Sequence, residues 1–190
     1  MLRLTSQRLK TIGFYGAFYK LSNPKVMSYS TSFIGELKSE SVNTKKILER
    51  VPLEKADWKP HEKSMSIGRL ATHIAETSQW ICRILENDEF DFASQTFKPR
   101  VASSKDELLE IFNNNLSKAI AALEKAGDAD MNKIWVVKKG EFIVFQMPKK
   151  VAIRGWGFSH ATHHRGQLSV YLRLLEIAVP GMYGLSADEK

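Results

Sequence analysis

The sequence predicts an all-α fold: a four-helix bundle with a crossover connection and a small β-hairpin between the third and fourth helices. Three observations predict it. Four long stretches repeat apolar residues at helical spacing, turn and cap residues separate those stretches, and one short segment is rich in β-forming residues instead. A length of 190 residues suits one domain. The long connections between the stretches favour a crossover over simple up-and-down neighbours.

The first two helices are predicted at residues 31–50 and 66–86. In the first, the apolar positions are Phe33, Leu37, Val42, Ile47 and Leu48. In the second, they are Ile67, Leu70, Ile74, Ile81, Ile84 and Leu85. Pro52 ends the first helix and Pro60 marks the connector, because proline lacks the backbone N–H that a helix interior needs.

The third helix is predicted at residues 104–126. Ser104 and Glu107 have the spacing of a capping box, in which side chains satisfy the free N–H groups of the first turn. The apolar face consists of Leu108, Ile111, Phe112, Leu116, Ala119, Ile120 and Leu123. Gly127 follows the last periodic residue, as is typical after the end of a helix.

The fourth helix is predicted at residues 149–177 and stops before Pro180-Gly181. Before it, the segment IWVVKKGEFIVFQM places two β-rich runs around Lys138-Lys139-Gly140. Such runs flanking a glycine turn predict a small hairpin. The last two helices are therefore joined through β structure.

The N-terminal residues 1–26 lack the apolar pattern of the helices. We expect residues 1–30 to be an N-terminal extension or leader and residues 31–190 to form the bundle domain. Its segment TIGFYGAFY is too short and too polar to span a bilayer, which needs about 20 apolar residues, and no clear small-x-small site follows it as in a secretory signal. A transit peptide stays open, because the leader is basic and contains no acid.

The composition argues against nucleic acid and membranes as partners and indicates a cytoplasmic location. The formal net charge is +7, but residues 1–35 hold five cations and no acid. The remainder carries only about +2, too little for a nucleic-acid footprint, and we expect no membrane association either. Cys82 is the one cysteine, which excludes an intrachain disulfide. It fits the reducing cytoplasm, where we expect the protein.

Three of the five histidines lie in the segment SHATHHRGQL. Each residue of a helix turns by about 100°, so His160 and His164 share one face, one turn apart. A helix presents two imidazoles to one metal with this spacing. The same face continues through Leu168 and Tyr171, so we expect it to point into the bundle. Buried imidazoles need partners, and a divalent cation would satisfy both.

His73 is the natural third ligand. It lies within the apolar pattern of the second helix, whereas His61 follows Pro60 in the connector and is expected to be exposed. Three imidazoles would form a His₃ site with open coordination positions. Cys82 lies about 180° around the helix from His73, so it cannot bind the same metal. Glu76, within one turn of His73, stays open as a base, as a partner behind a ligand, or as an exposed residue.

Each histidine also has a simpler interpretation. A histidine placed like His73, taken alone, is more commonly a hydrogen-bonded core residue than a metal ligand. The pair His160 and His164, taken alone, fits a metal site and a polar patch equally well. Two helices that both point histidines inward favour the metal. His163, about 60° from His160, either replaces a neighbour or points to solvent.

Three segments resemble the DinB (damage-inducible, YfiT-like) family: HATHHRGQLSVYLRLL, the tail VPGMYGLSADE, and the upstream DWKPHEKSMSIGRLATHIAE. The likeness covers roughly residues 36–189, and the long basic leader is atypical. The resemblance implies a four-helix bundle with a crossover and a metal triad at His73, His160 and His164. It also implies activities such as S-transfer and isomerisation that depend on low-molecular-weight thiols.

The first hypothesis is a metalloenzyme that uses an open divalent metal as a Lewis acid. The resemblance implies thiol transfer to a small electrophile as its leading reaction, with metal-assisted hydrolysis second. Zinc or nickel is expected, with iron as a further candidate, because imidazole suits all of them. The expected partner is a small-molecule substrate, including a low-molecular-weight thiol, and a second copy of the chain is a candidate partner. Arg165 either binds a carboxylate of thiol or substrate, or forms an ion pair on the surface of the helix. Gln167 either hydrogen-bonds a histidine that binds the metal or is exposed. Trp80 either lines the pocket or belongs to the core.

The alternative hypothesis is a non-catalytic, metal-stabilised module for binding or interaction. A di-iron carboxylate site is disfavoured, because it needs Glu-x-x-His pairs. Here the order is His73-x-x-Glu76, and the fourth helix has no acid beside its histidines. The sequence also contains no P-loop, no G-x-S-x-G elbow and no dinucleotide fingerprint.

Overall fold

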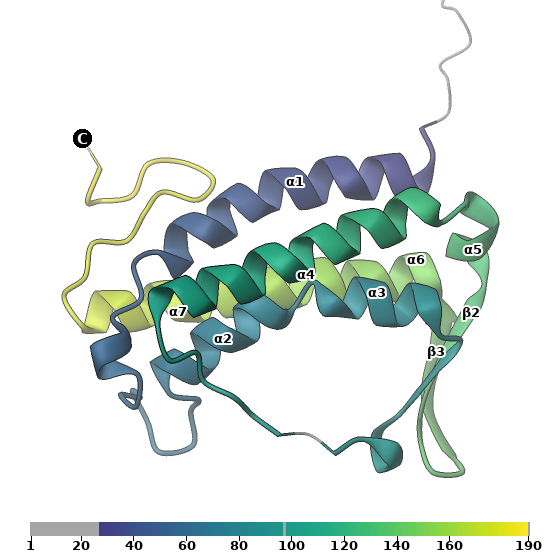
Figure 1. Ribbon diagram of the computed structural model, residues 1–190, viewed down its shortest axis with the longest axis horizontal. Coiled ribbons are helices and arrows are strands. Elements are labelled where there is room, and N and C mark those ends of the chain that lie inside the picture. The colour runs from purple at the N-terminus through teal and green to yellow at the C-terminus, as the bar shows by residue number, and fades with distance from the viewer. Residues whose placement is uncertain (1–26, 97, 190) are drawn as a thin grey trace, which may run out of the picture.

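The computed structural model describes residues 27–96 and 98–189, which form a mostly helical structure with a small three-stranded sheet at one end (Figure 1). In chain order the helices are α1 (Tyr29–Leu48), α2 (Ile67–Glu76), α3 (Gln79–Glu86), α4 (Lys105–Lys125), α5 (Asp128–Asn132), α6 (Lys149–Ala152) and α7 (His160–Leu174). The strands are β1 (Glu89–Asp91), β2 (Ile134–Lys139) and β3 (Phe142–Pro148). Two 3₁₀ turns, η1 (Leu53–Lys55) and η2 (Phe92–Ser94), and the π-helical segment η3 (Ile153–Ser159) complete the elements. The predicted leader, except for its last four residues, lies outside the described residues.

Serine side chains begin three of the long helices. Ser28, Ser66 and Ser104 each accept a hydrogen bond from the backbone N–H three residues later, at the starts of α1, α2 and α4. These bonds satisfy N–H groups that have no partner inside the helix. The capping box predicted at α4 is present in a shifted form: the Glu107 carboxylate accepts from the N–H of Ser103, at 2.7 Å, instead of that of Ser104.

The second predicted helix is two helices. α2 ends at Glu76 and α3 begins at Gln79. At the break, the Thr77 hydroxyl donates to the backbone carbonyl of Ile74 at 2.8 Å. Hydroxyl side chains compete in this way with the backbone hydrogen bonds of a helix. The apolar residues still face the core on both sides of the break, so the apolar pattern alone did not reveal it.

The fourth predicted helix is also divided, into α6, η3 and α7, and α7 ends at Leu174, three residues before the predicted end. A π-helical turn contains an extra residue and changes the direction in which later side chains point. Gly157 lies in this segment, and a Cβ placed on it would come within 2.9 Å of the Ile81 side chain. The glycine therefore lets η3 approach α3 closely, and His160 follows directly as the first residue of α7.

The predicted hairpin is confirmed, and a third strand joins it. β2 and β3 pair antiparallel, with Gly140 at the turn in the left-handed region at φ 61°, which suits glycine. β1 pairs in parallel with β2, through Glu89 opposite Val136. This strand lies between the second and third predicted helices, where no strand is predicted from the sequence. At the start of α6, the buried Lys149 ammonium donates to the Leu85 carbonyl and forms an ion pair with Asp88.

The described helices pack around two apolar clusters. One gathers residues of α1, α2, α4 and α7, and the other gathers residues of α1, α3, α4, α5, β2, α6 and η3. α4 contacts α1, α2 and α3, while α7 contacts α1 and α2. α2 and α7 therefore lie side by side, which is the contact that carries the histidines. Among the described helices, none is both long and apolar enough to cross a membrane.

Candidate metal centre

Three imidazoles meet where α2 packs on α7. One ring nitrogen each of His73, His160 and His164 lies within 4.8 Å of the other two. The Nε2 atoms of His73 and His160 are 3.2 Å apart. Two nitrogens bound to one tetrahedral zinc lie about 3.3 Å apart, given Zn–N bonds of about 2.0–2.1 Å. The three histidines that the sequence predicts as ligands of one metal therefore lie close enough together to hold one ion.

Two helices supply the three rings. His73 comes from the middle of α2, and His160 and His164 stand one turn apart on α7. The face below them is buried at Leu168 and Tyr171, as predicted from the apolar stripe. The packing of that stripe against α2 brings the histidines together.

Burial keeps these imidazoles in the form that binds metals. It lowers the pKa of His73 to about 4, helped by the nearby His164, His160 and Arg69. Burial also lowers the pKa of His160, against the effect of the Trp156 backbone carbonyl, and that of His164. All three rings are therefore neutral at pH 7, and a neutral ring keeps the lone pair that a metal ligand needs.

The second ring nitrogen of each histidine has a different environment. The Nδ1 of His164 lies 2.7 Å from Gln167 Oε1, and because that oxygen accepts, Nδ1 carries the proton and Nε2 keeps its lone pair. The Nδ1 of His160 is buried without a partner in good hydrogen-bond geometry among residues 27–96 and 98–189. The Nδ1 of His73 lies 3.5 Å from the Arg69 guanidinium.

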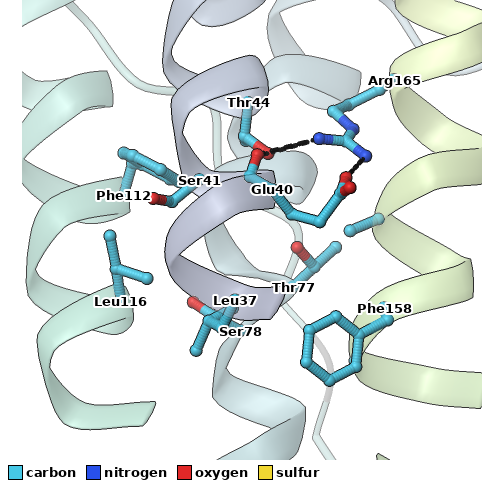
Figure 2. Close-up of a pocket in the computed structure, with 12 residues that line it drawn as sticks. Leu37, Glu40, Ser41, Thr44, Thr77, Ser78, Phe112, Leu116, Phe158 and Arg165 are labelled. Carbon is cyan, nitrogen blue, oxygen red and sulfur yellow. Dashed lines mark hydrogen bonds and ion pairs between the residues drawn. The ribbon is translucent and has the colours of Figure 1, made fainter. Parts of the chain in front are cut away.

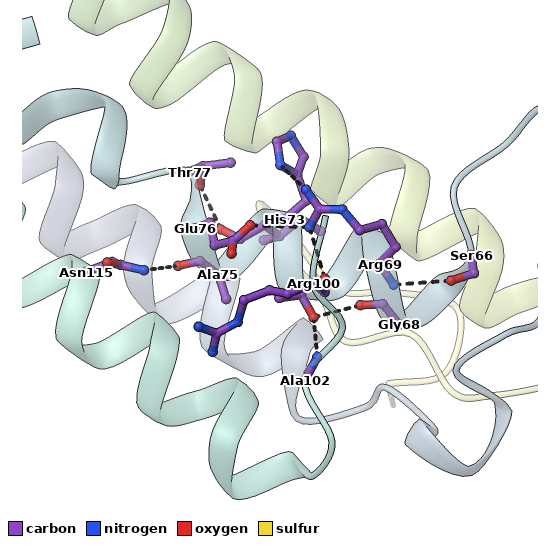
Figure 3. Close-up of polar contacts among 12 residues, drawn as sticks. Ser66, Gly68, Arg69, His73, Ala75, Glu76, Thr77, Arg100, Ala102 and Asn115 are labelled. Carbon is purple, nitrogen blue, oxygen red and sulfur yellow. Dashed lines mark hydrogen bonds and ion pairs between the residues drawn. The ribbon is translucent and has the colours of Figure 1, made fainter. Parts of the chain in front are cut away.

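Arg69 connects the centre to a carboxylate. Figure 3 shows its guanidinium between His73 and Glu76. The guanidinium forms an ion pair with the Glu76 carboxylate at 3.3 Å. Glu76 therefore lies next to the centre without belonging to the group of close ligand atoms. Of the three readings that the sequence left open for Glu76, full exposure is the one that these contacts disfavour. Sequence reasoning missed Arg69, although 69, 73 and 76 share one face of α2.

The donor set fits a divalent metal. Three neutral imidazoles converge, and no cysteine or carboxylate joins them in the part of the chain that the structure describes. A cation could accept the lone pairs of both Nε2 atoms at once, whereas in their direct contact at 3.2 Å one ring must supply a proton to the other. Imidazole donors suit zinc, nickel, iron and copper alike, so the geometry does not select among them. Three ligands leave coordination positions for water or substrate.

Arg165 lies outside this centre, although it directly follows His164. It is buried, and Figure 2 shows its guanidinium turned towards Glu40 and Thr44 of α1. It forms an ion pair with the Glu40 carboxylate and donates to the Tyr183 hydroxyl at 2.7 Å. Tyr183 in turn donates to Glu40 at 2.8 Å.

The remaining predicted positions divide between the pocket and the surface. Trp80 lies in the wall of a pocket of about 440 Å³ that His73 and Glu76 also line. His163 is exposed and absent from the triad, its ring 5.0 Å from that of His164. His61 is exposed in the connector, as expected. Sequence reasoning missed the aromatic residues that β1 and η2 add to this pocket, for which the alternation in EFDF was the available signal.

Comparison with known proteins agrees with the fold. The chain is 24% identical over 157 residues to the protein YrdA of Bacillus subtilis (strain 168). The aligned region covers 83% of this chain and 89% of that protein. A DinB-like protein of Bacillus cereus ATCC 10987 superposes with a TM-score of 0.62 at 22% identity, covering 80% of this chain and 95% of that one. The DinB-like protein YjoA of Bacillus subtilis superposes with a TM-score of 0.59 at 17% identity, over 84% and 99% of the two chains.

The family model for the DinB family matches residues 27–190, which include all three clustered histidines and exclude most of the predicted leader. The match runs through both helices that build the centre and through the C-terminal tail. This chain belongs to the DinB family.

Proposed function

We propose that this protein is a divalent-metal-dependent enzyme that transfers a low-molecular-weight thiol to a small electrophile, with metal-assisted hydrolysis as the next reaction class. One observation carries the proposal: three neutral imidazoles converge beside a pocket of about 440 Å³ that has a carboxylate in its wall. A site that only stabilised the fold would be expected to be closed by a fourth protein ligand.

The chain's own residues divide the work. His73, His160 and His164 would hold the metal, which would act as a Lewis acid and lower the pKa of a bound thiol or water. Gln167 is a positioning residue that holds the His164 ring through its Nδ1 proton. Glu76, held by Arg69, is placed to accept the proton that the thiol or water releases.

Of the two sequence-based readings of Arg165, we propose the ion pair. Its guanidinium already binds Glu40, Thr44, Thr162 and Tyr183, so a substrate carboxylate would have to displace one of them. The ion pair is buried, not on the helix surface as expected. Arg165 then fixes α7 relative to α1 and the C-terminal segment.

The finer architecture is part of the proposal. We propose a four-helix bundle with a crossover, built from α1, α2 with α3, α4, and η3 with α7, and a domain that begins near residue 31. The contacts of α4 with three neighbours and of α7 with α1 and α2 support this arrangement. A cytoplasmic location and a homodimer stay predictions, and light scattering of the metal-loaded protein tests the homodimer.

The experiment that tests the function combines metal content with turnover. The full chain is purified without a metal-affinity tag, its metal content is measured by elemental analysis, and the zinc and nickel forms are assayed with a panel of thiols. With 1-chloro-2,4-dinitrobenzene, the thiolate forms a C–S bond, chloride leaves, and the thiol proton goes to the base. We expect one metal per chain and metal-dependent turnover.

Two outcomes contradict the proposal. Absence of stoichiometric metal under saturating zinc or nickel would remove its basis. One bound metal without thiol transfer or ester hydrolysis would instead support the alternative, a metal-stabilised binding module. Glu76→Gln should keep the metal and lower turnover, while Glu62→Gln, in the exposed connector, should change neither.

A further inference from the structure

A pocket with an aromatic wall adjoins the metal centre. It has a volume of about 440 Å³, within the usual range for small-molecule sites. His73 lines the pocket, and Trp80, Phe90 and Phe92 contribute its aromatic surface. The elements involved are α2 and α3 on one side and β1 with η2 on the other.

The aromatic rings form a continuous, supported surface. The ring centroids of Trp80 and Phe90 are 5.1 Å apart, as are those of Phe90 and Phe92, both in edge-to-face geometry. Trp156 supports Trp80 from η3 at 4.5 Å. Phe92 nevertheless leaves 46% of its surface exposed. Stacking a planar ligand on this surface would bury apolar area that now contacts water.

The segment that carries Phe92 is held in place before any ligand binds. Asp91 Oδ1 accepts from the N–H of Ala93 at 2.8 Å and from the N–H of Gly140, at the hairpin turn, at 3.0 Å. These two bonds tie η2 to the sheet. A wall that is ordered beforehand loses less conformational freedom on binding.

The charges of the pocket favour an anion. Arg83 lines it with its guanidinium 5.4 Å from the centre of a Trp80 ring, and it makes no ion pair among the described residues. The one carboxylate in the pocket wall is that of Glu76, which already pairs with Arg69. The uncompensated charge within the described wall is therefore positive.

We propose that this pocket binds a small planar aromatic carboxylate, stacked on Trp80, Phe90 and Phe92 with its carboxylate at Arg83. This substrate class rests on the proposed function in one respect only: the end of the ligand that contacts neither the aromatic wall nor Arg83 would face His73 and the metal. The binding step itself needs the aromatic wall and the arginine, so it can be measured without the metal.

The test uses isothermal titration calorimetry of 2-naphthoate into the full chain, in zinc-loaded and metal-depleted forms. 2-Naphthamide, which keeps the rings without the charge, and cyclohexanecarboxylate, which keeps the charge without the rings, are the comparison ligands. We expect saturable binding of 2-naphthoate to both forms, weaker binding of both comparison ligands, and a shift of the Trp80 indole NMR signal.

Variants separate the two parts of the proposed site. Phe92→Ala should weaken 2-naphthoate about two- to tenfold, the range for one aromatic contact. Arg83→Gln should weaken 2-naphthoate about two- to fivefold, as for an exposed ion pair, and leave 2-naphthamide unchanged. Asp91→Ala should weaken both aromatic ligands without changing metal content. Phe142→Ala and Arg50→Gln, both at exposed positions outside this pocket, are the matched controls.

The outcomes distinguish this inference from the proposed function. Unchanged binding in both Phe92→Ala and Arg83→Gln would overturn the inference, as would binding that requires zinc and persists in Phe92→Ala, because the ligand would then bind the metal. Neither result would contradict the proposal that the three histidines bind a metal. Binding to metal-depleted protein that depends on Phe92 and Arg83 would support the inference even if the chain failed to bind metal or to turn over thiols.

Discussion

His164 and Arg165 are consecutive residues of α7, and they bury polar groups in opposite ways. The Arg165 guanidinium is surrounded by partners from α1, α7 and the C-terminal segment. His164 has one partner, Gln167, on one ring nitrogen, and its other nitrogen faces two more histidines. The Arg165 site is satisfied by groups of the protein alone, whereas three neutral ring nitrogens converge at the histidine centre.

The difference shows how a structural polar cluster is distinguished from a functional one. Buried polar groups in folded proteins are nearly always satisfied, because leaving one unsatisfied costs about 1–3 kcal/mol. The Arg165 network follows this rule. The histidine centre departs from it where three neutral ring nitrogens converge, with the Nε2 atoms of His73 and His160 3.2 Å apart, and such departures are found where a ligand completes the set.

The largest effect is expected for the metal ligands. His73→Ala should reduce zinc affinity by more than about 100-fold, because loss of a residue behind a ligand already costs about 10–100-fold. His160→Ala and His164→Ala should do the same. His163→Ala is the matched control on α7, and its metal content should be spared or fall only modestly, as measured by elemental analysis after dialysis. If His163→Ala lost the metal while His73→Ala kept it, the metal would lie on α7 alone.

Substitutions in the Arg165 network should change the stability of the fold and leave the metal content unchanged. Glu40→Ala leaves the buried guanidinium without its carboxylate, which should lower the free energy of unfolding by about 3 kcal/mol. Glu36→Ala, which breaks the exposed ion pair with Arg154, should lower it by less than about 1 kcal/mol. Urea unfolding at a fixed metal load measures both. A loss of zinc from folded Glu40→Ala would show that the two clusters are coupled.

A smaller effect is expected for Gln167. Gln167→Ala removes the acceptor that holds the His164 Nδ1 proton, so zinc affinity should fall about 10–100-fold while stability changes little. Gln167→Glu restores an acceptor and should recover most of the affinity. Competition with a chromophoric chelator gives the affinities. Equal affinity in all three proteins would mean that Gln167 does not position the ring.

The helices and the histidines were predictable because both depend on spacing along one helix. The face shared by His160 and His164 continues into Leu168 and Tyr171, so the sequence alone indicated that it is buried. His73 could be paired with them because it lies in an apolar pattern of its own. The hairpin was predictable because its two strands are neighbours in the chain.

The missed features depend on contacts between distant segments. β1 is three residues long and is a strand only because it pairs with β2, more than forty residues later in the chain. The π-helical turn before His160 leaves no mark in the apolar pattern. Glu40, the partner of Arg165, is 125 residues away on another helix, so the sequence could not decide between the two readings of that arginine.

The smallest expected effect is a difference in how stability depends on pH. In the folded, metal-free protein, burial lowers the pKa of His73 to about 4 and also lowers those of His160 and His164. In the unfolded chain, these rings take up protons near pH 6.5. Between these values the unfolded state binds more protons, so stability should be full above about pH 6.5 and fall as the pH decreases towards 4.

Carboxylates act in a lower window. Hydrogen bonds from Arg173 and the Val179 N–H lower the pKa of Asp188 to about 2, so its contribution is lost only as the pH falls from about 3.8 towards 2. Urea midpoints at pH 7.5, 6 and 5 therefore report mainly on the histidines. His73→Ala should flatten this dependence, and His61→Ala, in the exposed connector, should keep the slope of the native chain. Parallel curves for the two variants would mean that the buried imidazoles do not set the acid sensitivity. Saturating zinc should make the native protein resist acid to a lower pH, because protons must then compete with the metal for the same nitrogens.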